Sequence, residues 1–300
     1  MRARDLSKGI DWGSLAPLAL RSREVAEGVY AGGHRSARRG AGVEFGGHRE
    51  YLPGDDLRWL DRRSLLRHDH LLVRQFETET DRALRLVVDA TASMAYRGGT
   101  APGAKLAFAA LCAAALARIA VGSGDPIGLT FIGGEGQRGV PVSGGREAFE
   151  RVVAALETVE PGGDAFTGPE VLERALGAIA RTARRGSILV VLSDLLDMPA
   201  GAVLRVASLA SAGRVVVVVQ TLDRDEETLP WEGTLRLRAL EGPGLVETDP
   251  SVTRDGYLRA LAALRDEWKT ALLARGARFV TASTNDDPVA VVRAIVEAVR

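Results

Sequence analysis

The chain has 300 residues, of which 46% are hydrophobic and 26% charged, and its 39 basic side chains balance its 39 acidic ones. This composition excludes a disordered or fibrous protein, and the length allows one large domain or two ordinary ones. A formal net charge of zero gives no general attraction to nucleic acid or to a membrane surface, so neither is expected as a partner.

The cysteine content and the N-terminus favour a reducing compartment. Cys112 is the only cysteine, so no intramolecular disulfide and no thiolate metal cluster can form. The opening segment MRARDLSKGIDWGSL lacks the continuous apolar stretch of a signal peptide, and Arg118 interrupts the most apolar helix, near 105–120. We therefore expect a cytoplasmic protein without a membrane span.

Residues 1–82 are predicted to form an N-terminal helix and a loop-rich segment that packs on the domain after it. The helix is amphipathic and covers about 12–30, whereas 31–70 is rich in Gly, Arg, Asp and His. Pro53-Gly54 is typical of a tight turn, and the segment LLVRQFETE then returns to strand character. All four histidines lie in 31–70 without helical spacing or cysteine support, which disfavours a transition-metal site.

Residues 83–300 are predicted to form an α/β domain with a doubly wound, mostly parallel sheet. Apolar runs of strand length alternate there with helix-length periodic segments, and the runs are continuous enough for strands buried on both faces. The predicted strands are RLVVDA, PIGLTFI, SILVVLSD, VVVVVQTL and ARFVTAS. The predicted helices cover about 103–121, 145–158, 169–184, 199–211, 251–275 and 287–299.

Two further features of this domain concern helix starts and an insertion. Asp197-Met198-Pro199 and Asp287-Pro288 match helix N-termini, where an acidic cap and an early proline are favoured. An irregular insertion near 223–250 is predicted to hold one short strand, TLRLRAL.

Polar residues at the ends of the predicted strands indicate a ligand site, because ligands of open parallel sheets bind outside the carboxyl ends of the strands. The first strand runs into Asp89-Ala90-Thr91-Ala92-Ser93, and another ends at Ser193-Asp194. Thr167 lies in the loop before the helix that leads to that second strand.

These side chains suit a divalent cation. Mg²⁺ prefers oxygen ligands and keeps waters readily, and Mn²⁺ or Ca²⁺ accept similar donors. The predicted metal ligands are Asp89, Thr91, Ser93, Thr167 and Asp194. Neutral hydroxyl ligands leave positive charge on the metal, which favours an acidic group from a partner protein. The alternative is that Asp89 and Ser93 only bind backbone amides at a strand-to-helix turn.

At these residues the chain resembles the von Willebrand A domain and its metal-ion-dependent adhesion site. The motif of that site is Asp-x-Ser-x-Ser with a distant Thr and Asp, and here Thr91 stands in a serine position. The resemblance implies a von Willebrand A-like, Rossmann-type fold and a metal-dependent protein-binding function without catalysis.

The stretch before the sheet domain resembles the signature of a bacterial family known as domain of unknown function fifty-eight. The matching residues are Gly42, Glu44-Phe45, Arg49-Glu50-Tyr51, Pro53-Gly54-Asp55-Asp56, Arg58, Asp61, Arg67, Glu79 and Ser93-Met94. Arg62 departs from the family, which usually has tryptophan there. The resemblance implies an adaptor that acts with a MoxR-type AAA+ ATPase in chaperone-like maturation of a client protein. The interleaved charges of this segment also suit an ion-pair network that clamps it to the sheet domain.

An enzymatic alternative is a metal-dependent phosphohydrolase with Asp89 as nucleophile. Thr91 counts against it, because a general acid and base is expected two residues after the nucleophile. A Ser-His-Asp hydrolase of the usual order is excluded, since no histidine follows Ser93. The GxGxxG at 134–139 does not open a helix, so a dinucleotide site is disfavoured.

Overall fold

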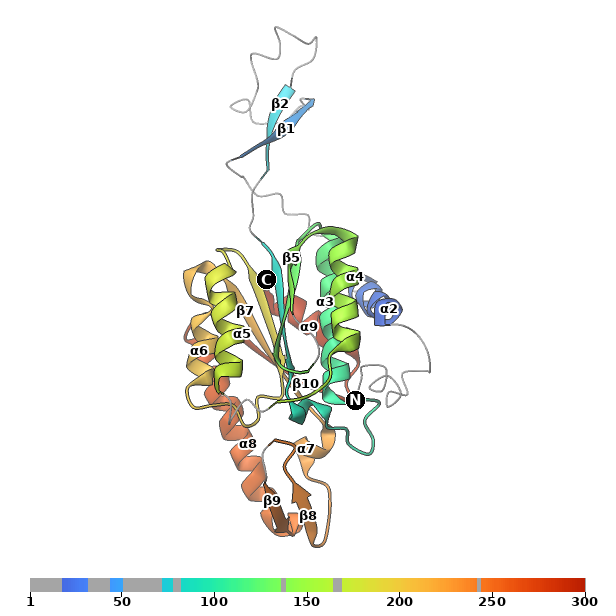
Figure 1. Ribbon diagram of the computed structural model, residues 1–300, viewed down its shortest axis with the longest axis vertical. Helices are drawn as coiled ribbons and strands as arrows, with labels where there is room; N and C mark the ends of the chain where they lie inside the picture. Colours follow the sequence, from blue (N-terminus) through green and yellow to red (C-terminus); the bar gives the residue numbers. More distant parts are fainter. Residues whose placement is uncertain are drawn as a thin grey trace. The chain divides into compact units, whose positions relative to one another are not determined.

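The computed structural model describes residues 18–31, 44–50, 72–77, 82–135, 139–163, 169–241 and 244–299 (Figure 1). They fall into two compact units. One holds helix α2 (Leu18–Ala31) and the chain from residue 83 onward, and the other spans His34–Arg82. In the second unit, β1 (Glu44–Glu50) pairs antiparallel with β2 (Leu72–Glu77). The turn and ion pairs predicted for 51–71 lie outside the described residues, and the packing of that segment on the sheet domain stays a prediction.

The first unit is built on a six-stranded sheet in the order β10-β7-β6-β3-β4-β5. Its strands are β3 (Leu84–Ala90), β4 (Ile127–Gly133), β5 (Val140–Ser143), β6 (Ile188–Ser193), β7 (Val215–Leu222) and β10 (Arg278–Ser283). Neighbours pair in parallel except β4 and β5, which are antiparallel. The five predicted strands and the doubly wound, mostly parallel sheet are confirmed. The edge strand β5 was not predicted, because four residues that include Pro141 give little strand signal.

Helices cover both faces of this sheet (Figure 1). They are α3 (Lys105–Gly122), α4 (Gly145–Thr158), α5 (Pro169–Thr182), α6 (Ala202–Ser208), α8 (Pro250–Leu273) and α9 (Pro288–Val299). Alternate residues of β3 face opposite ways, as a strand requires. Leu86 and Val88 join the cluster that includes α2, α3, α4 and α9, whereas Val87 joins the cluster of α5, α6 and α8. Each face of the sheet is therefore buried under its own layer of helices.

Helix α3 is the most apolar element, and every residue from Lys105 to Ala117 is buried. Among the described residues, α3 is the one helix that is both long enough and apolar enough to cross a membrane. However, 78% of it is buried inside the domain. A core helix between a sheet and the helices α2, α4 and α9 needs the same composition.

The two predicted helix starts have different outcomes. The Asp287-Pro288 start is confirmed, since α9 begins at Pro288 and the Asp287 carboxylate accepts the Val289 N–H at 3.0 Å. The Asp197-Met198-Pro199 start is wrong, because α6 begins only at Ala202. Asp197 has a positive φ of 53°, so the chain turns there before the helix begins.

The insertion between β7 and α8 projects beyond the carboxyl ends of the parallel strands (Figure 1). It contains α7 (Arg224–Thr228) and an antiparallel pair, β8 (Leu235–Arg238) and β9 (Leu245–Thr248). The predicted strand in TLRLRAL is therefore confirmed as β8, whereas β9 and α7 were not predicted. This placement brings the insertion to the edge where the predicted ligands lie.

Candidate metal site at the carboxyl edge of the sheet

The turn after β3 gathers three oxygen-bearing side chains. The Asp89 Oδ1 atom accepts the Thr91 backbone N–H at 2.9 Å and the Thr91 hydroxyl at 2.8 Å. The Thr91 and Ser93 hydroxyl oxygens are 3.2 Å apart. Asp89 and Thr91 are buried, whereas Ser93 is partly exposed, so the cluster opens towards solvent at Ser93. One of the backbone interactions expected of a simple turn is also present, because Asp89 accepts the Thr91 amide.

The end of β6 lies against the same turn. The Ser193 hydroxyl donates to Asp89 Oδ2 at 2.5 Å and accepts the Leu195 N–H at 3.0 Å. Burial of Asp89, and then the charge of nearby Asp194, raise the pKa of Asp89 to about 7, although the bonds from Ser193 and Thr91 lower it. Two buried carboxylates beside each other favour a nearby cation.

A cation from the chain itself already contacts one of them. The Lys105 ammonium lies 2.7 Å from Asp194 Oδ2 and 2.6 Å from Glu226 Oε1, and the Lys105 side chain is 0% exposed. Burial lowers the pKa of Lys105, but Asp194 and Glu226 more than offset this, so the pKa is raised and the ammonium stays charged. The other Asp194 oxygen, Oδ1, accepts the Leu196 N–H at 3.0 Å. Asp194 therefore serves first as the partner of Lys105.

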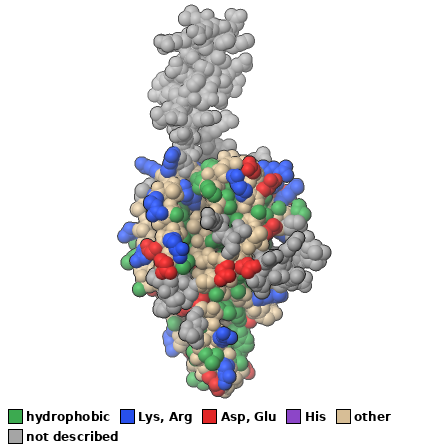
Figure 2. Space-filling model, in the orientation of Figure 1, with side chains coloured by type: hydrophobic (Ala, Val, Ile, Leu, Met, Phe, Trp, Pro, Cys, Tyr) green, Lys and Arg blue, Asp and Glu red, His purple; other side chains and the backbone are tan. Residues whose placement is uncertain are grey.

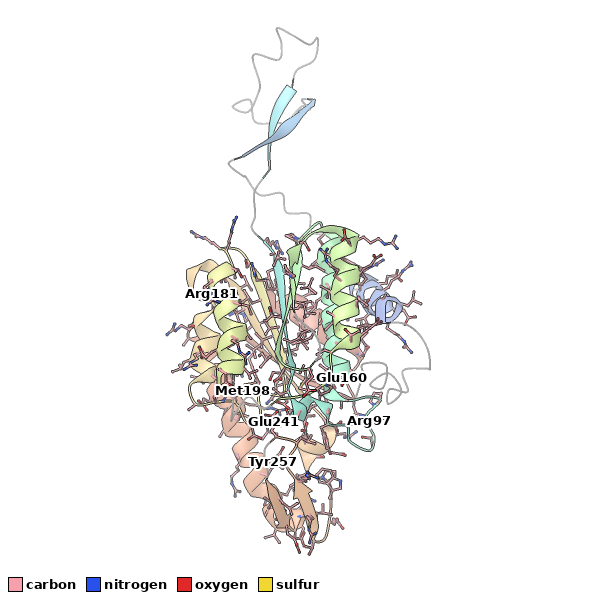
Figure 3. The ribbon with its side chains drawn as sticks, viewed as in Figure 1. Arg97, Glu160, Arg181, Met198, Glu241 and Tyr257 are labelled. Atoms are coloured by element: carbon pink, nitrogen blue, oxygen red, sulfur yellow. The ribbon has the colours of Figure 1, made fainter. Side chains whose placement is uncertain are left out.

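A carboxylate from the insertion contacts the turn from the other side. The Ser93 backbone N–H donates to Glu241 Oε1 at 3.2 Å. Burial raises the pKa of Glu241, while hydrogen bonds with the Ser93 and Thr91 side chains lower it. In Figure 3, Glu241 lies between the end of the sheet and the insertion.

Asp223, at the end of β7, holds the loop between the turn and α3. Its Oδ2 atom accepts the Gly98 N–H at 2.9 Å and the Thr284 hydroxyl at 3.0 Å, and its Oδ1 atom accepts the Asp225 N–H at 3.0 Å as a cap of α7. A side chain at Gly98 would clash with the Asp223 carboxylate. The glycine is needed for this close approach.

The donor chemistry of the turn fits a hard divalent cation. The Asp89 carboxylate and the hydroxyls of Thr91 and Ser93 are the oxygen donors that Mg²⁺, Mn²⁺ and Ca²⁺ accept. Asp194 is close but is shared with Lys105, and Thr167 lies outside the described residues. Within the described ranges no three His, Cys, Asp or Glu side chains are grouped so that they could hold a metal ion, so a site at this turn depends on the hydroxyl ligands.

Three charged residues of this edge were not predicted from the sequence. Lys105 begins an apolar helix, where one lysine in a buried stretch is the available signal. Glu226 stands three residues after Asp223 in a capping box, which is a local pattern that indicates a helix start. Glu241 has no local signal, because only the folded insertion brings it to Ser93.

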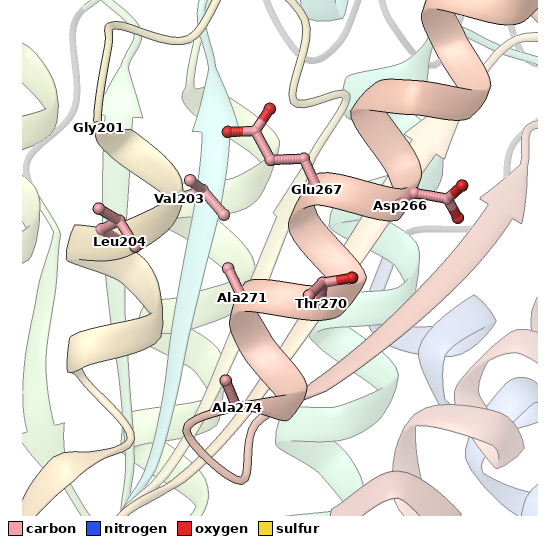
Figure 4. A pocket seen from close by; sticks show the side chains of 8 residues that line it. All are labelled: Gly201, Val203, Leu204, Asp266, Glu267, Thr270, Ala271 and Ala274. Carbon is pink, nitrogen blue, oxygen red and sulfur yellow. The ribbon is translucent and has the colours of Figure 1, made fainter.

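A shallow groove elsewhere on the domain is not part of this site (Figure 4). It lies between α6 and α8 and is lined by Gly201, Val203, Leu204, Asp266, Glu267, Thr270, Ala271 and Ala274. Figure 2 shows basic and acidic side chains both present on one face of the domain. The chemistry of the oxygen donors at the sheet edge makes that edge the stronger candidate.

Comparison with known proteins identifies the family of the chain. The family model described as "Protein of unknown function DUF58" matches residues 47–267. Uncharacterized protein Rv1480 of Mycobacterium tuberculosis (strain ATCC 25618 / H37Rv) is 30% identical over 277 residues, which is 91% of this chain and 85% of the relative. Uncharacterized protein Mb1516 of Mycobacterium bovis has the same identity and coverage.

Two solved structures are also similar. A conserved hypothetical protein BatB from Bacteroides thetaiotaomicron shares 18% identity at a TM-score of 0.47, covering 72% of this chain and 98% of that one. A von Willebrand factor type A protein from Catenulispora acidiphila shares 14% identity at a TM-score of 0.41, covering 75% of this chain and 43% of that one. Since the family model matches most of its length, this chain belongs to the DUF58 family, and its sheet domain is a doubly wound, mostly parallel α/β domain.

Proposed function

We propose that this protein is a non-enzymatic interaction module whose turn after β3 holds a divalent cation, and that the cation makes the binding of another protein metal-dependent. The observation that supports this most is the grouping of Asp89, Thr91 and Ser93, linked by bonds of 2.8 Å and 3.2 Å. A bound Mg²⁺ would supply positive charge for an acidic group of the partner.

The residues at this edge would have different roles in binding the cation. Asp89 would supply the charged ligand, and the hydroxyls of Thr91 and Ser93 would supply neutral ones. Ser193 fixes the second Asp89 oxygen through its 2.5 Å bond, which keeps the carboxylate oriented. Lys105 balances Asp194, so that Asp194 does not repel further negative charge from the site.

For the partner we propose a MoxR-type AAA+ ATPase, with an unknown client protein matured in the cytoplasm. This rests on what the family resemblance implies, since relatives are typically encoded beside such ATPases, and on an oxygen cluster that opens towards solvent at Ser93. ATP hydrolysis then belongs to the partner.

The phosphohydrolase alternative is less well supported by the geometry. Asp89 is 0% exposed, and both of its carboxylate oxygens accept hydrogen bonds. A nucleophile must come into contact with the substrate phosphorus, and a phosphate ester cannot approach a fully buried carboxylate. The residue two positions on, Thr91, has no carboxyl group to carry a proton.

Affinity purification from the native cell tests the proposal. Tagged wild type, Asp89→Ala and the exposed control Asp255→Ala are each purified with Mg²⁺ or with a chelator, and the recovered proteins are identified by mass spectrometry. We expect an AAA+ ATPase with wild type and Asp255→Ala in Mg²⁺ alone. Equal recovery of the ATPase with and without the chelator, and with wild type and Asp89→Ala, would contradict metal dependence. Turnover of a generic phosphate ester that Asp89→Asn abolishes would favour the enzyme instead.

A further inference from the structure

The insertion places an acidic side chain where the proposed function expects the acid of a partner. Glu241 Oε1 accepts the Ser93 backbone N–H at 3.2 Å, and the carboxylate lies near enough to the side chains of Thr91 and Ser93 for them to lower its pKa. Glu241 therefore lies beside both neutral ligands of the candidate site. It does so from a segment about 150 residues further along the chain, which only the fold brings there.

Acidic side chains gather at this edge. They include Asp89, Asp194, Glu226 and Glu241, and Lys105 contacts Asp194 and Glu226. Asp89 and Glu241 both lie beside Thr91, whereas Lys105 contacts Asp194 and Glu226. A divalent cation beside the two hydroxyls would be neutralised by one carboxylate on each side.

We propose that Glu241 is an internal ligand of the cation held at the Asp89-Thr91-Ser93 turn, and that an acidic group of a partner must displace it. This rests on the proposed function, because it presupposes the cation. It adds that the insertion completes the site and competes with the partner. The domain then exchanges one carboxylate for another when it binds.

Binding of Mn²⁺ to the full chain tests this inference. Affinity is measured by calorimetry, and water proton relaxation reports the number of waters on the bound Mn²⁺. The variants are Glu241→Gln, Glu241→Ala and Glu247→Gln. Glu247 is the matched control, because it lies in the same insertion but pairs with Arg236 on the exposed β8–β9 surface. Acetate is added to Glu241→Ala as a small carboxylate that could enter the vacated position.

We expect Glu241→Gln and Glu241→Ala to bind Mn²⁺ at least tenfold more weakly and with more bound water, and Glu247→Gln to match wild type. Acetate should restore part of the affinity of Glu241→Ala. If wild type binds Mn²⁺ but Glu241→Gln binds it as tightly and with the same water count, this inference is overturned and the metal site stands. If wild type binds no Mn²⁺, the metal dependence in the proposed function fails and the inference fails with it.

Discussion

The buried ammonium of Lys105 gives a sharp test of how the carboxyl edge is held together. Lys105→Met keeps an unbranched side chain of similar length and removes the charge. The two contacts of 2.6 Å and 2.7 Å each contribute about 6 kcal/mol of attraction at an effective dielectric constant of about 20, before the desolvation of three charged groups is subtracted. Removing one partner of a buried network leaves the others unpaired, and the net cost is about 3–5 kcal/mol.

Urea denaturation at neutral pH measures this cost as the loss in the free energy of unfolding. The deficit of Lys105→Met should shrink at pH 5, because burial raises the pKa of Glu226, which can take up a proton once Lys105 is gone. The control is Arg146→Ala, whose ion pair with Glu150 is exposed and contributes about 0.3–0.5 kcal/mol. A Lys105→Met deficit as small as that of the control would refute the role given to the buried ammonium. If Lys105→Met does not fold, Lys105→Met combined with Asp194→Asn and Glu226→Gln should recover folding.

Three other predictions concern the same edge. Without metal, the raised Asp89 pKa of about 7 stabilises the fold fully below pH about 4, and this stabilisation is lost as pH rises through about 7. The free energy of unfolding should therefore fall between these pH values in wild type but not in Asp89→Asn. Mg²⁺ should raise the melting temperature at pH 8 and not at pH 5, because protonated Asp89 cannot ligate; equal shifts at both pH values would count against Asp89 as a ligand. Gly98→Ala should lower the free energy of unfolding by about 1–3 kcal/mol, because the added methyl clashes with Asp223. Gly99→Ala has open space around it, so its free energy of unfolding in urea should stay within about 0.5 kcal/mol of wild type.

The fold was predictable because its signal is local and repeated. Val216–Val219 and Leu189–Leu192 are buried throughout, and continuous aliphatic runs of that kind occur where helices cover both faces of a strand. The start of α6 was placed wrongly because an acidic residue and a proline also begin turns, and only the positive φ of Asp197 distinguishes the two cases.

The candidate site was predictable only where its residues follow a strand. Asp89, Thr91 and Asp194 stand at strand ends, and the parallel sheet brings those ends to one edge. Lys105 and Glu241 reach that edge from a helix and from an insertion. Their contacts depend on long-range packing, which neither periodicity nor spacing encodes.

The central claim is that the side chains of Asp89, Thr91 and Ser93 hold a divalent cation, and a crystal grown with Mn²⁺ tests it most directly. An anomalous difference map is calculated at the manganese edge. We predict a peak within ligand distance of the Asp89 carboxylate or its bound water and of the hydroxyls of Thr91 and Ser93. A map with no peak at this turn, in a crystal that keeps the Lys105 ammonium on Asp194, would contradict the claim and leave Lys105 as the cation that this edge requires.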